Sequence, residues 1–236
     1  MVYVMSDIHG NMDRFKSIMK QIRLKPEDKL YVLGDVIDRY PFGIKILRQL
    51  MSMPNVEMLL GNHEHMMLEA LDKPFDPWSM DQDLALRRWY NNGGDITHSK
   101  LKHTSLAVRD EVFSYLRDLP LNIDIEVNGK KYKLVHAAPE EWFSKIGYYR
   151  YDNVKDFAVW YRLRPTDPIP EDYTLIFGHT PTMEYQDENP LKIWQGEDRI
   201  DIDCGSGFPM DLAYFEPKGR LACLRLDDMQ EFYSEM

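Results

Sequence analysis

The sequence predicts an α/β fold in which two packed β-sheets are flanked by helices. In the N-terminal third, short apolar runs alternate with segments of helical period, an order typical of parallel strands joined by right-handed crossovers. Further apolar runs continue to the C-terminus, and together they are too many for one small sheet. These two observations favour two sheets with helices outside them.

The N-terminal third contains three expected strands, each of which ends in polar residues. The strands are Val2–Met5, Leu30–Leu33 and Val56–Leu60, and the polar clusters that follow them are Ser6–Gly10, Gly34–Arg39 and Gly61–Glu64. Apolar residues at helical spacing lie between the strands: Phe15, Ile18 and Ile22, then Ile44, Leu47 and Met51. In open sheets of this kind ligands bind at the carboxyl ends of the strands, where the polar clusters lie.

The rest of the chain is expected to hold a helical segment followed by more strands. The pattern from about Asp81 to Asp118 is helical with a break at Asn91–Gly94, and residues 75–118 are expected to form a cap-like insertion in a single domain spanning residues 1–236. Asn128-Gly129 predicts a hairpin turn. The remaining expected elements are strands at Leu121–Val127, Tyr132–Val135, Thr174–Phe177, Ile200–Ile202, Leu212–Phe215 and Leu221–Leu226, and a helix at Val154–Tyr161.

Composition excludes several classes of partner. A formal net charge of -10 lacks the basic footprint of a protein that binds nucleic-acid polymers. Only two cysteines are present, Cys204 and Cys223, which indicates buried thiols in a reducing compartment. No apolar run approaches the ~18 residues of a membrane span, and the N-terminus has the pattern of a strand instead of a signal peptide. The protein is therefore expected in the cytoplasm, with no membrane partner.

Five expected strand ends carry side chains suited to metal coordination. They are Asp7 with His9, Asp35 with Asp38 and Arg39, Asn62 with His63, His136, and His179. Taken singly, Asp7 or Asn62 could be a helix cap and His179 a structural histidine. Together they favour a two-metal site for displacement at phosphorus, with manganese, iron or zinc better suited to the mixed ligands than calcium or magnesium.

The same blocks resemble the calcineurin-like metallophosphoesterases. The resemblance is strongest to their serine/threonine protein phosphatase branch, particularly small bacterial and phage members, and runs in order from Ser6 to about Gly207. The blocks are Asp7-Ile8-His9, Gly34–Arg39, Gly61–Glu64, Val135-His136-Ala137 and Gly178–Pro181. The resemblance implies a four-layer sandwich, with two mixed β-sheets flanked by helices and a dinuclear site at the strand ends.

The resemblance also implies which residues bind the two metal ions, with manganese expected first and iron or zinc left open. The first ion would be held by Asp7, His9 and Asp35. The second would be held by Asp35, which bridges, together with the set Asn62, His136 and His179. Some relatives have a further histidine where Pro181 stands, so the first ion is expected to have only three protein ligands.

Four further residues receive roles through the resemblance. His63 matches the general acid that protonates the leaving oxygen, and Asp38 matches the carboxylate that pairs with it. Arg39 matches an arginine that grips the phosphate. Arg162 resembles a second phosphate arginine, with Arg164 as the competing candidate and a solvated helix end as an open alternative for either.

Two further features bear on the surroundings of the expected site. Trp89, Asn92–Gly94 and Thr97 resemble a segment of bacterial phosphatases and symmetrical dinucleoside tetraphosphate hydrolases. The segment is expected either as a helical cap near the mouth of the site or as a simple loop between helices. Tyr40 stands where the family commonly has glycine, which is expected to alter the wall of the phosphate pocket.

The expected activity is hydrolysis of phosphomonoesters, phosphoserine and phosphothreonine among them. The resemblance implies direct attack by a hydroxide that bridges the metals, with His63 as the general acid. The alternative is a symmetrical dinucleoside tetraphosphate or other nucleotide hydrolase, whose usual signature has a small residue in place of Asp38. A metal-free binding module is the non-enzymatic alternative, which the complete ligand set disfavours.

Overall fold

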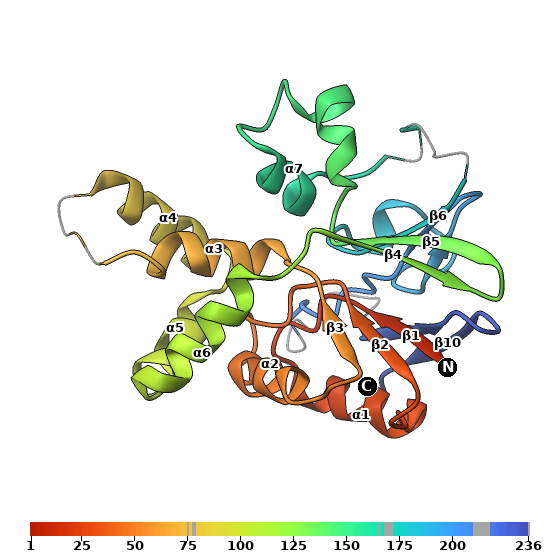
Figure 1. Cartoon of the computed structure of the whole chain (residues 1–236), viewed down its shortest axis with the longest axis horizontal. Helices are drawn as coiled ribbons and strands as arrows, with labels where there is room; N and C mark the ends of the chain where they lie inside the picture. Colours follow the sequence, from red (N-terminus) through yellow and green to blue (C-terminus); the bar gives the residue numbers. More distant parts are fainter. Residues whose placement is uncertain (75, 77–78, 165, 168–171, 210–217, 236) are drawn as a thin grey trace.

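Two five-stranded sheets form the centre of the molecule (Figure 1). The computed structural model describes residues 1–74, 76, 79–164, 166–167, 172–209 and 218–235. The first sheet has the order β10-β9-β1-β2-β3, with β1 Val2–Met5, β2 Lys29–Val32, β3 Val56–Met58, β9 Ala222–Arg225 and β10 Gln230–Tyr233. The second has the order β4-β5-β6-β8-β7, with β4 Asn122–Val127, β5 Lys130–Val135, β6 Thr174–Phe177, β7 Trp194–Gln195 and β8 Arg199–Asp201.

Both sheets are mixed. In the first, β1, β2 and β3 run parallel, whereas β9 pairs antiparallel with β1 and with β10. In the second, β5, β6 and β8 run parallel, and β4 and β7 are antiparallel edges. The carboxyl ends of the parallel strands of each sheet therefore share one edge.

Alternating side chains on the strands separate three hydrophobic layers. Tyr3 and Met5 of β1 face the helices α1 (Met12–Ile22) and α2 (Gly43–Met51), which lie below the first sheet in Figure 1. Val4, on the opposite face of the same strand, packs in the layer between the sheets. The outer face of the second sheet packs against α7 (Val154–Trp160). The result is the expected sandwich of helices, sheet, sheet and helices.

Four helices lie together at the left of Figure 1, beside β3. They are α3 Asn62–Leu71, α4 Met80–Asn91, α5 Asp95–Lys102 and α6 Leu106–Arg117. Short helical turns lie at η1 Glu140–Trp142, η2 Phe143–Gly147 and η3 Thr182–Glu184. In the part of the chain that is described, no helix is both long and apolar enough to cross a membrane.

The predicted fold class is confirmed, and the differences lie at the sheet edges. The expected strand Leu212–Phe215 lies outside the described residues. β7 and β10 were not predicted, because an edge strand buries little surface and therefore needs no apolar run. Consistent with this, β10 is polar at its start and none of its residues is fully buried.

Candidate metal centre

The loops after six parallel strands place their polar residues in one buried region. Asp7 follows β1 and Asp35 follows β2, and each has a left-handed backbone with φ of 54° and 55°. His179, after β6, is also left-handed with φ of 66°. Non-glycine residues avoid this conformation unless the surrounding structure enforces it, and such strain collects at functional sites.

The helix-cap alternatives for Asp7 and Asn62 are wrong. The side chain of Asn11 caps α1 by accepting from the Arg14 N–H at 3.2 Å. Gly61 is the N-cap of α3, and Asn62 is the first residue of that helix with its side chain directed to two histidines. Both Asp7 and Asn62 are 2 % exposed, so neither is a solvated surface group.

The two carboxylate oxygens of Asp35 face two different groups of ligands. Oδ2 lies 3.7 Å from His9 Nε2, which is also 3.8 Å from Asp7 Oδ1. Oδ1 lies 3.6 Å from His136 Nε2. Ligand atoms that each lie about 2.1 Å from a shared ion are separated by distances of this order. Asp35 therefore stands between two potential cation sites.

The second group is completed by the side-chain oxygen of Asn62. This oxygen is 2.9 Å from His136 Nε2 and 2.9 Å from His179 Nδ1. Asp35, His136 and His179 each place one potential ligand atom within 4.8 Å of the others.

Three histidines are candidate metal ligands, namely His9, His136 and His179. Each has one ring nitrogen near a backbone carbonyl and the other directed into the site. His9 Nδ1 is 3.2 Å from the Ile37 carbonyl, His136 Nδ1 is 2.7 Å from that of Leu33, and His179 Nε2 is 3.2 Å from that of Trp160. A carbonyl can only accept, so the network assigns the hydrogen to these nitrogens and leaves the inward ones as bases. Burial also lowers the pKa of His9 and His179 well below the ordinary value, which keeps both rings neutral, as ligands must be.

The chemistry of this donor set fits divalent cations. Burial raises the pKa of Asp35 well above its usual range, and the charge of Asp7 adds to the increase. Neutral imidazoles cannot compensate two buried carboxylates, whereas bound cations would. An oxygen and nitrogen donor set without thiolates suits manganese, iron or zinc.

His63 lies beside the ligand groups with both ring nitrogens in contact. Nδ1 is 2.7 Å from Asp38 Oδ2, and Nε2 is 3.8 Å from Asp35 Oδ2 and 3.3 Å from Arg39 Nη2. The indole N–H of Trp89 donates to the same Asp38 oxygen at 2.7 Å. His63 and Asp38 are 1 % and 0 % exposed, so this pair is not a surface ion pair.

Comparison with known proteins agrees with this geometry. The sequence profile described as calcineurin-like phosphoesterase matches residues 1–202. The chain belongs to this family. It is therefore a metallophosphoesterase, a hydrolase of phosphate esters from a family that uses divalent metals.

Individual relatives carry two kinds of name. Serine/threonine-protein phosphatase 2 of Salmonella typhimurium is 27 % identical over 226 residues, which cover 92 % of this chain and 93 % of that protein. The symmetrical bis(5'-nucleosyl)-tetraphosphatase of Serratia proteamaculans is 39 % identical over 64 residues, only 26 % of this chain and 23 % of that protein. A metallophosphoesterase structure from Sphaerobacter thermophilus has a TM-score of 0.57 and 17 % identity, covering 100 % of this chain and 87 % of that chain, which supports the shared fold.

The segment with Trp89, Gly93 and Thr97 contacts the phosphoesterase site directly. The hydroxyl oxygen of Thr97 accepts from the Asp38 N–H at 3.0 Å, and the Gly93 carbonyl accepts from the Arg39 N–H at 3.1 Å. A Cβ on Gly94 would lie 2.3 Å from the Trp89 ring, so only glycine allows this contact. The segment between α4 and α5 is therefore part of the wall of the site.

Two supporting carboxylates were missed by the sequence analysis. Glu64, on the first turn of α3, accepts from the N–H groups of Asp35, Val36 and Ile37 at 2.9, 2.9 and 3.2 Å. Asp203, after β8, is buried, and burial together with the charge of Asp7 raises its pKa to about 8. A sixth strand end with the pattern Asp-x-Asp was the available signal for Asp203.

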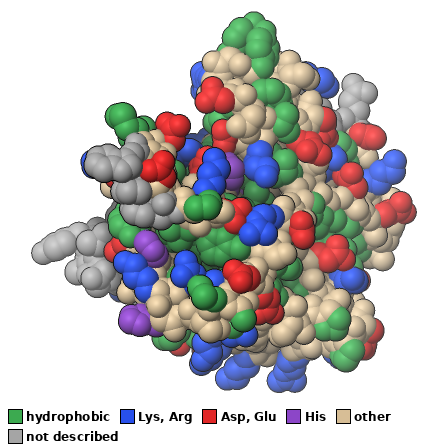
Figure 2. Space-filling model, turned by 60° about the vertical axis from the view of Figure 1, so that its left-hand side comes forward, with side chains coloured by type: hydrophobic (Ala, Val, Ile, Leu, Met, Phe, Trp, Pro, Cys, Tyr) green, Lys and Arg blue, Asp and Glu red, His purple; other side chains and the backbone are tan. Residues whose placement is uncertain are grey.

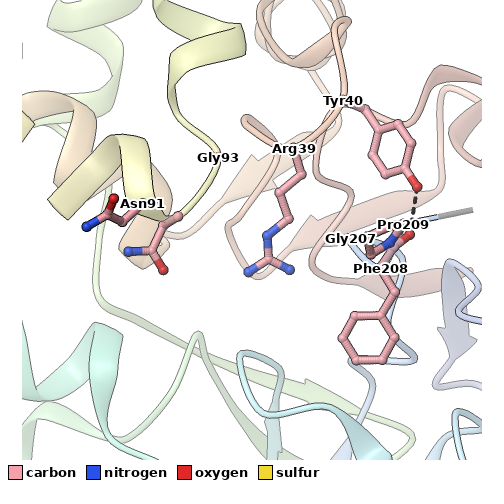
Figure 3. Close-up of a pocket in the computed structure, with 8 residues that line it drawn as sticks. Arg39, Tyr40, Asn91, Gly93, Gly207, Phe208 and Pro209 are labelled. Atoms are coloured by element: carbon pink, nitrogen blue, oxygen red, sulfur yellow. Dashed lines mark hydrogen bonds between the residues drawn. The ribbon is translucent and has the colours of Figure 1, made fainter. Parts of the chain in front are cut away.

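A cavity of about 610 Å³ opens beside Arg39. Figure 3 shows the Arg39 guanidinium in this space, between Asn91 on one side and Phe208 on the other. The Tyr40 hydroxyl donates to the Phe208 carbonyl at 2.6 Å. Tyr40, which replaces the usual glycine of the family, is thus part of the cavity wall (Figure 3).

The charge of Arg162 affects the pKa of two groups of the candidate site. Burial is the main reason that the pKa of His179 is lowered, and the charges of His136 and Arg162 lower it further. Arg162 also acts on Asp203, where it opposes the effect of burial on the pKa. Figure 2, viewed from the side of α3 and α4, shows basic side chains around the middle of this face with acidic ones between them.

Proposed function

We propose that this phosphoesterase hydrolyses phosphomonoesters, with phosphoserine and phosphothreonine esters among its substrates. The observation that carries the proposal is the position of Asp35, whose two oxygens face two separate groups of buried ligands. Asp7, His9 and Asp35 would hold one ion, and Asp35, Asn62, His136 and His179 the other. Manganese is proposed for both positions, with iron or zinc as the alternatives.

The two ions would lower the pKa of water so that a nucleophile is available near neutral pH. Arg39 would bind two phosphoryl oxygens with its planar guanidinium, because its side chain enters the same space as His63 Nε2. Arg162, rather than Arg164, is proposed as the second phosphate ligand because it is only two residues from Trp160, whose carbonyl lies 3.2 Å from His179 Nε2. These contacts neutralise charge on the phosphoryl group as it is transferred.

His63 is proposed as the general acid. Asp38 Oδ2, at 2.7 Å from Nδ1, would fix the orientation of the ring, so that Nε2 is directed toward the shared space and can deliver a proton there. As the oxygen of the attacking water bonds to phosphorus, the bond to the leaving oxygen breaks and that oxygen takes the proton of His63. Trp89 would hold Asp38 in place through the same carboxylate oxygen.

The proposal is tested by metal analysis of the freshly purified protein followed by a substrate panel with manganese added. The panel contains p-nitrophenyl phosphate, a phosphoserine peptide and diadenosine tetraphosphate. We expect about two ions per chain and hydrolysis of the first two substrates. Stoichiometric metal with no hydrolysis of any monoester would contradict the proposal.

A second candidate is hydrolysis of dinucleoside tetraphosphates or another nucleotide. The cavity beside Arg39 favours it, because its volume of about 610 Å³ leaves room for a group larger than a phosphate, between the aromatic ring of Phe208 and the amide of Asn91. Against it stands Asp38, which is engaged with His63 where the usual signature of that class has a small residue. Preference for diadenosine tetraphosphate in the same panel would select this candidate.

A further inference from the structure

A second cavity, of about 510 Å³, is lined by three arginines, Arg150, Arg162 and Arg164. Trp160, Thr180 and Tyr185 also line it. This cavity is distinct from the one beside Arg39, because the described residues that line the two cavities are all different.

The arginine-lined cavity adjoins the metal centre. Thr180 follows the proposed ligand His179 in the chain, and the Trp160 carbonyl lies 3.2 Å from His179 Nε2. The Trp160 ring stands edge-on to the His179 ring, with centroids 5.8 Å apart. Arg162 follows Trp160 by two residues and lines the same cavity as Trp160 and Thr180.

Arg162 and Arg164 point to the same side because the chain is extended after α7. Tyr161 has φ of -66° and ψ of 133°, and burial alternates along the segment, with Tyr161 and Leu163 buried and both arginines exposed. The backbone of the segment is fixed from two directions. The Tyr185 hydroxyl donates to the Leu163 carbonyl at 2.6 Å, and Asp167 Oδ2 accepts from the Arg164 N–H at 2.8 Å.

Among the residues that the structure describes, arginines outnumber acidic residues in the lining of this cavity. No carboxylate there lies within ion-pair distance of the Arg150, Arg162 or Arg164 guanidinium, although the whole chain carries a net charge of -10. Of the described residues that line the cavity, Glu184 alone is acidic. One guanidinium group can donate two parallel hydrogen bonds to the oxygens of a phosphate, so three guanidinium groups in one recess suit a phosphate group.

We propose that Arg150 and Arg164 form an outer subsite that binds a second phosphate group of the substrate while the first is hydrolysed at the metal centre. The inference rests on the proposed function. Substrates with one phosphate would use only the inner arginines, Arg39 and Arg162. The second phosphate can belong to a neighbouring phosphorylated residue of a peptide or to the polyphosphate chain of a dinucleotide.

The test compares kcat/KM of the manganese-loaded enzyme on two peptides, one with a single phosphoserine and one with two, and on diadenosine tetraphosphate and p-nitrophenyl phosphate. The variant is the double substitution R150Q/R164Q. Lys155→Gln serves as the matched control, because Lys155 lies on α7, is exposed and does not line the cavity. It removes a nearby positive charge without touching the proposed subsite.

In R150Q/R164Q we expect kcat/KM for the substrate with the second phosphate to fall about tenfold relative to p-nitrophenyl phosphate, as expected for two partly exposed charge-assisted contacts. The peptide arm and the dinucleotide arm then identify the source of the second phosphate. Glu184→Gln removes a negative charge from the cavity, so it should raise kcat/KM for the substrate with the second phosphate relative to p-nitrophenyl phosphate. Equal ratios in wild type, R150Q/R164Q and K155Q in both arms would overturn the proposal.

Binding of inorganic pyrophosphate to the metal-free protein gives a readout that does not depend on hydrolysis. Calorimetry should show a dissociation constant about tenfold higher in R150Q/R164Q than in wild type or K155Q. If wild type hydrolyses no phosphoester but this difference is found, the proposed function fails and the subsite stands. An unchanged dissociation constant overturns the subsite.

Discussion

At the scale of single residues, His63 is defined by its two neighbours. Asp38 occupies one ring nitrogen at 2.7 Å, and Arg39 Nη2 lies 3.3 Å from the other. The carboxylate fixes the orientation of the imidazole, and on the proposed function Nε2 would deliver a proton to the leaving oxygen. A leaving alkoxide needs that proton, whereas a nitrophenolate does not.

His63→Asn is therefore expected to lower kcat for alkyl phosphates by ~10²–10⁴ and for p-nitrophenyl phosphate by much less, because asparagine cannot act as the acid. Metal content should remain that of wild type. The measurement is kcat on both ester types together with metal analysis. An equal loss on both ester types would show that His63 has another role.

Trp89 is a second residue that contacts the carboxylate of Asp38. Its indole is fully buried, and its N–H donates to the Asp38 oxygen that also faces His63 Nδ1. Trp89→Phe should lower kcat about tenfold with little change in KM, and should destabilise the fold by about 1 kcal/mol through the lost hydrogen bond. Trp142→Phe, in the hydrophobic cluster beside α7, is the control and should affect stability alone. Equal kcat in the two variants would exclude Trp89 as a positioning residue.

At the scale of elements, the first turn of α3 organises the loop after β2. Glu64 is fully buried there, and it accepts three backbone N–H groups from residues 35–37. The helix thereby supplies Asn62 and His63 to the site and also fixes the loop that carries Asp35. A single element thus determines the spacing between residues far apart in the sequence.

Glu64→Gln should lower metal affinity about tenfold, because one acceptor oxygen becomes a donor and the Asp35 loop loses a hydrogen bond. It should also destabilise the fold by about 1–3 kcal/mol. Manganese titration and thermal unfolding measure the two effects. Glu57→Gln, on the exposed face of β3, should change neither, and an affinity unchanged in Glu64→Gln would refute the positioning role.

At the scale of the whole molecule, the candidate metal centre draws its residues from both sheets. Asp7 and Asp35 come from the first sheet, and His136 and His179 come from the second. Ions that bind only the folded arrangement stabilise it by mass action, by about 2.7 kcal/mol at a hundredfold excess over the dissociation constant.

Removal of metal by a chelator should therefore lower Tm by roughly 5–10 °C, given ~2–4 °C per kcal/mol for a chain of this size. The measurement is thermal unfolding with chelator and with added manganese. Asp35→Asn should show a far smaller manganese-dependent shift and almost no hydrolysis. A Tm that is independent of manganese in wild type would contradict the placement of ions between the sheets.

The local pattern of the sequence was sufficient for the elements whose side chains alternate or repeat strongly. Buried parallel strands require continuous apolar runs, so β1, β2 and β6 were predicted to within a residue or two. Polar residues directly after neighbouring parallel strands share an edge, which brought Asp7 and Asp35 together in the prediction. His179 follows a strand of the second sheet, so its place beside them depends on how the sheets pack. These conclusions depend on the hydrophobic pattern along the chain and on the geometry of parallel sheets.

The tertiary structure alone decided which atom faces which partner. Three features depend on packing between distant segments. Asp35 presents its two oxygens to different groups, Glu64 fixes the loop after β2, and Trp89 reaches Asp38. Side-chain direction is set by contacts that form only after the chain has folded, and one sequence without its fold does not contain those distances.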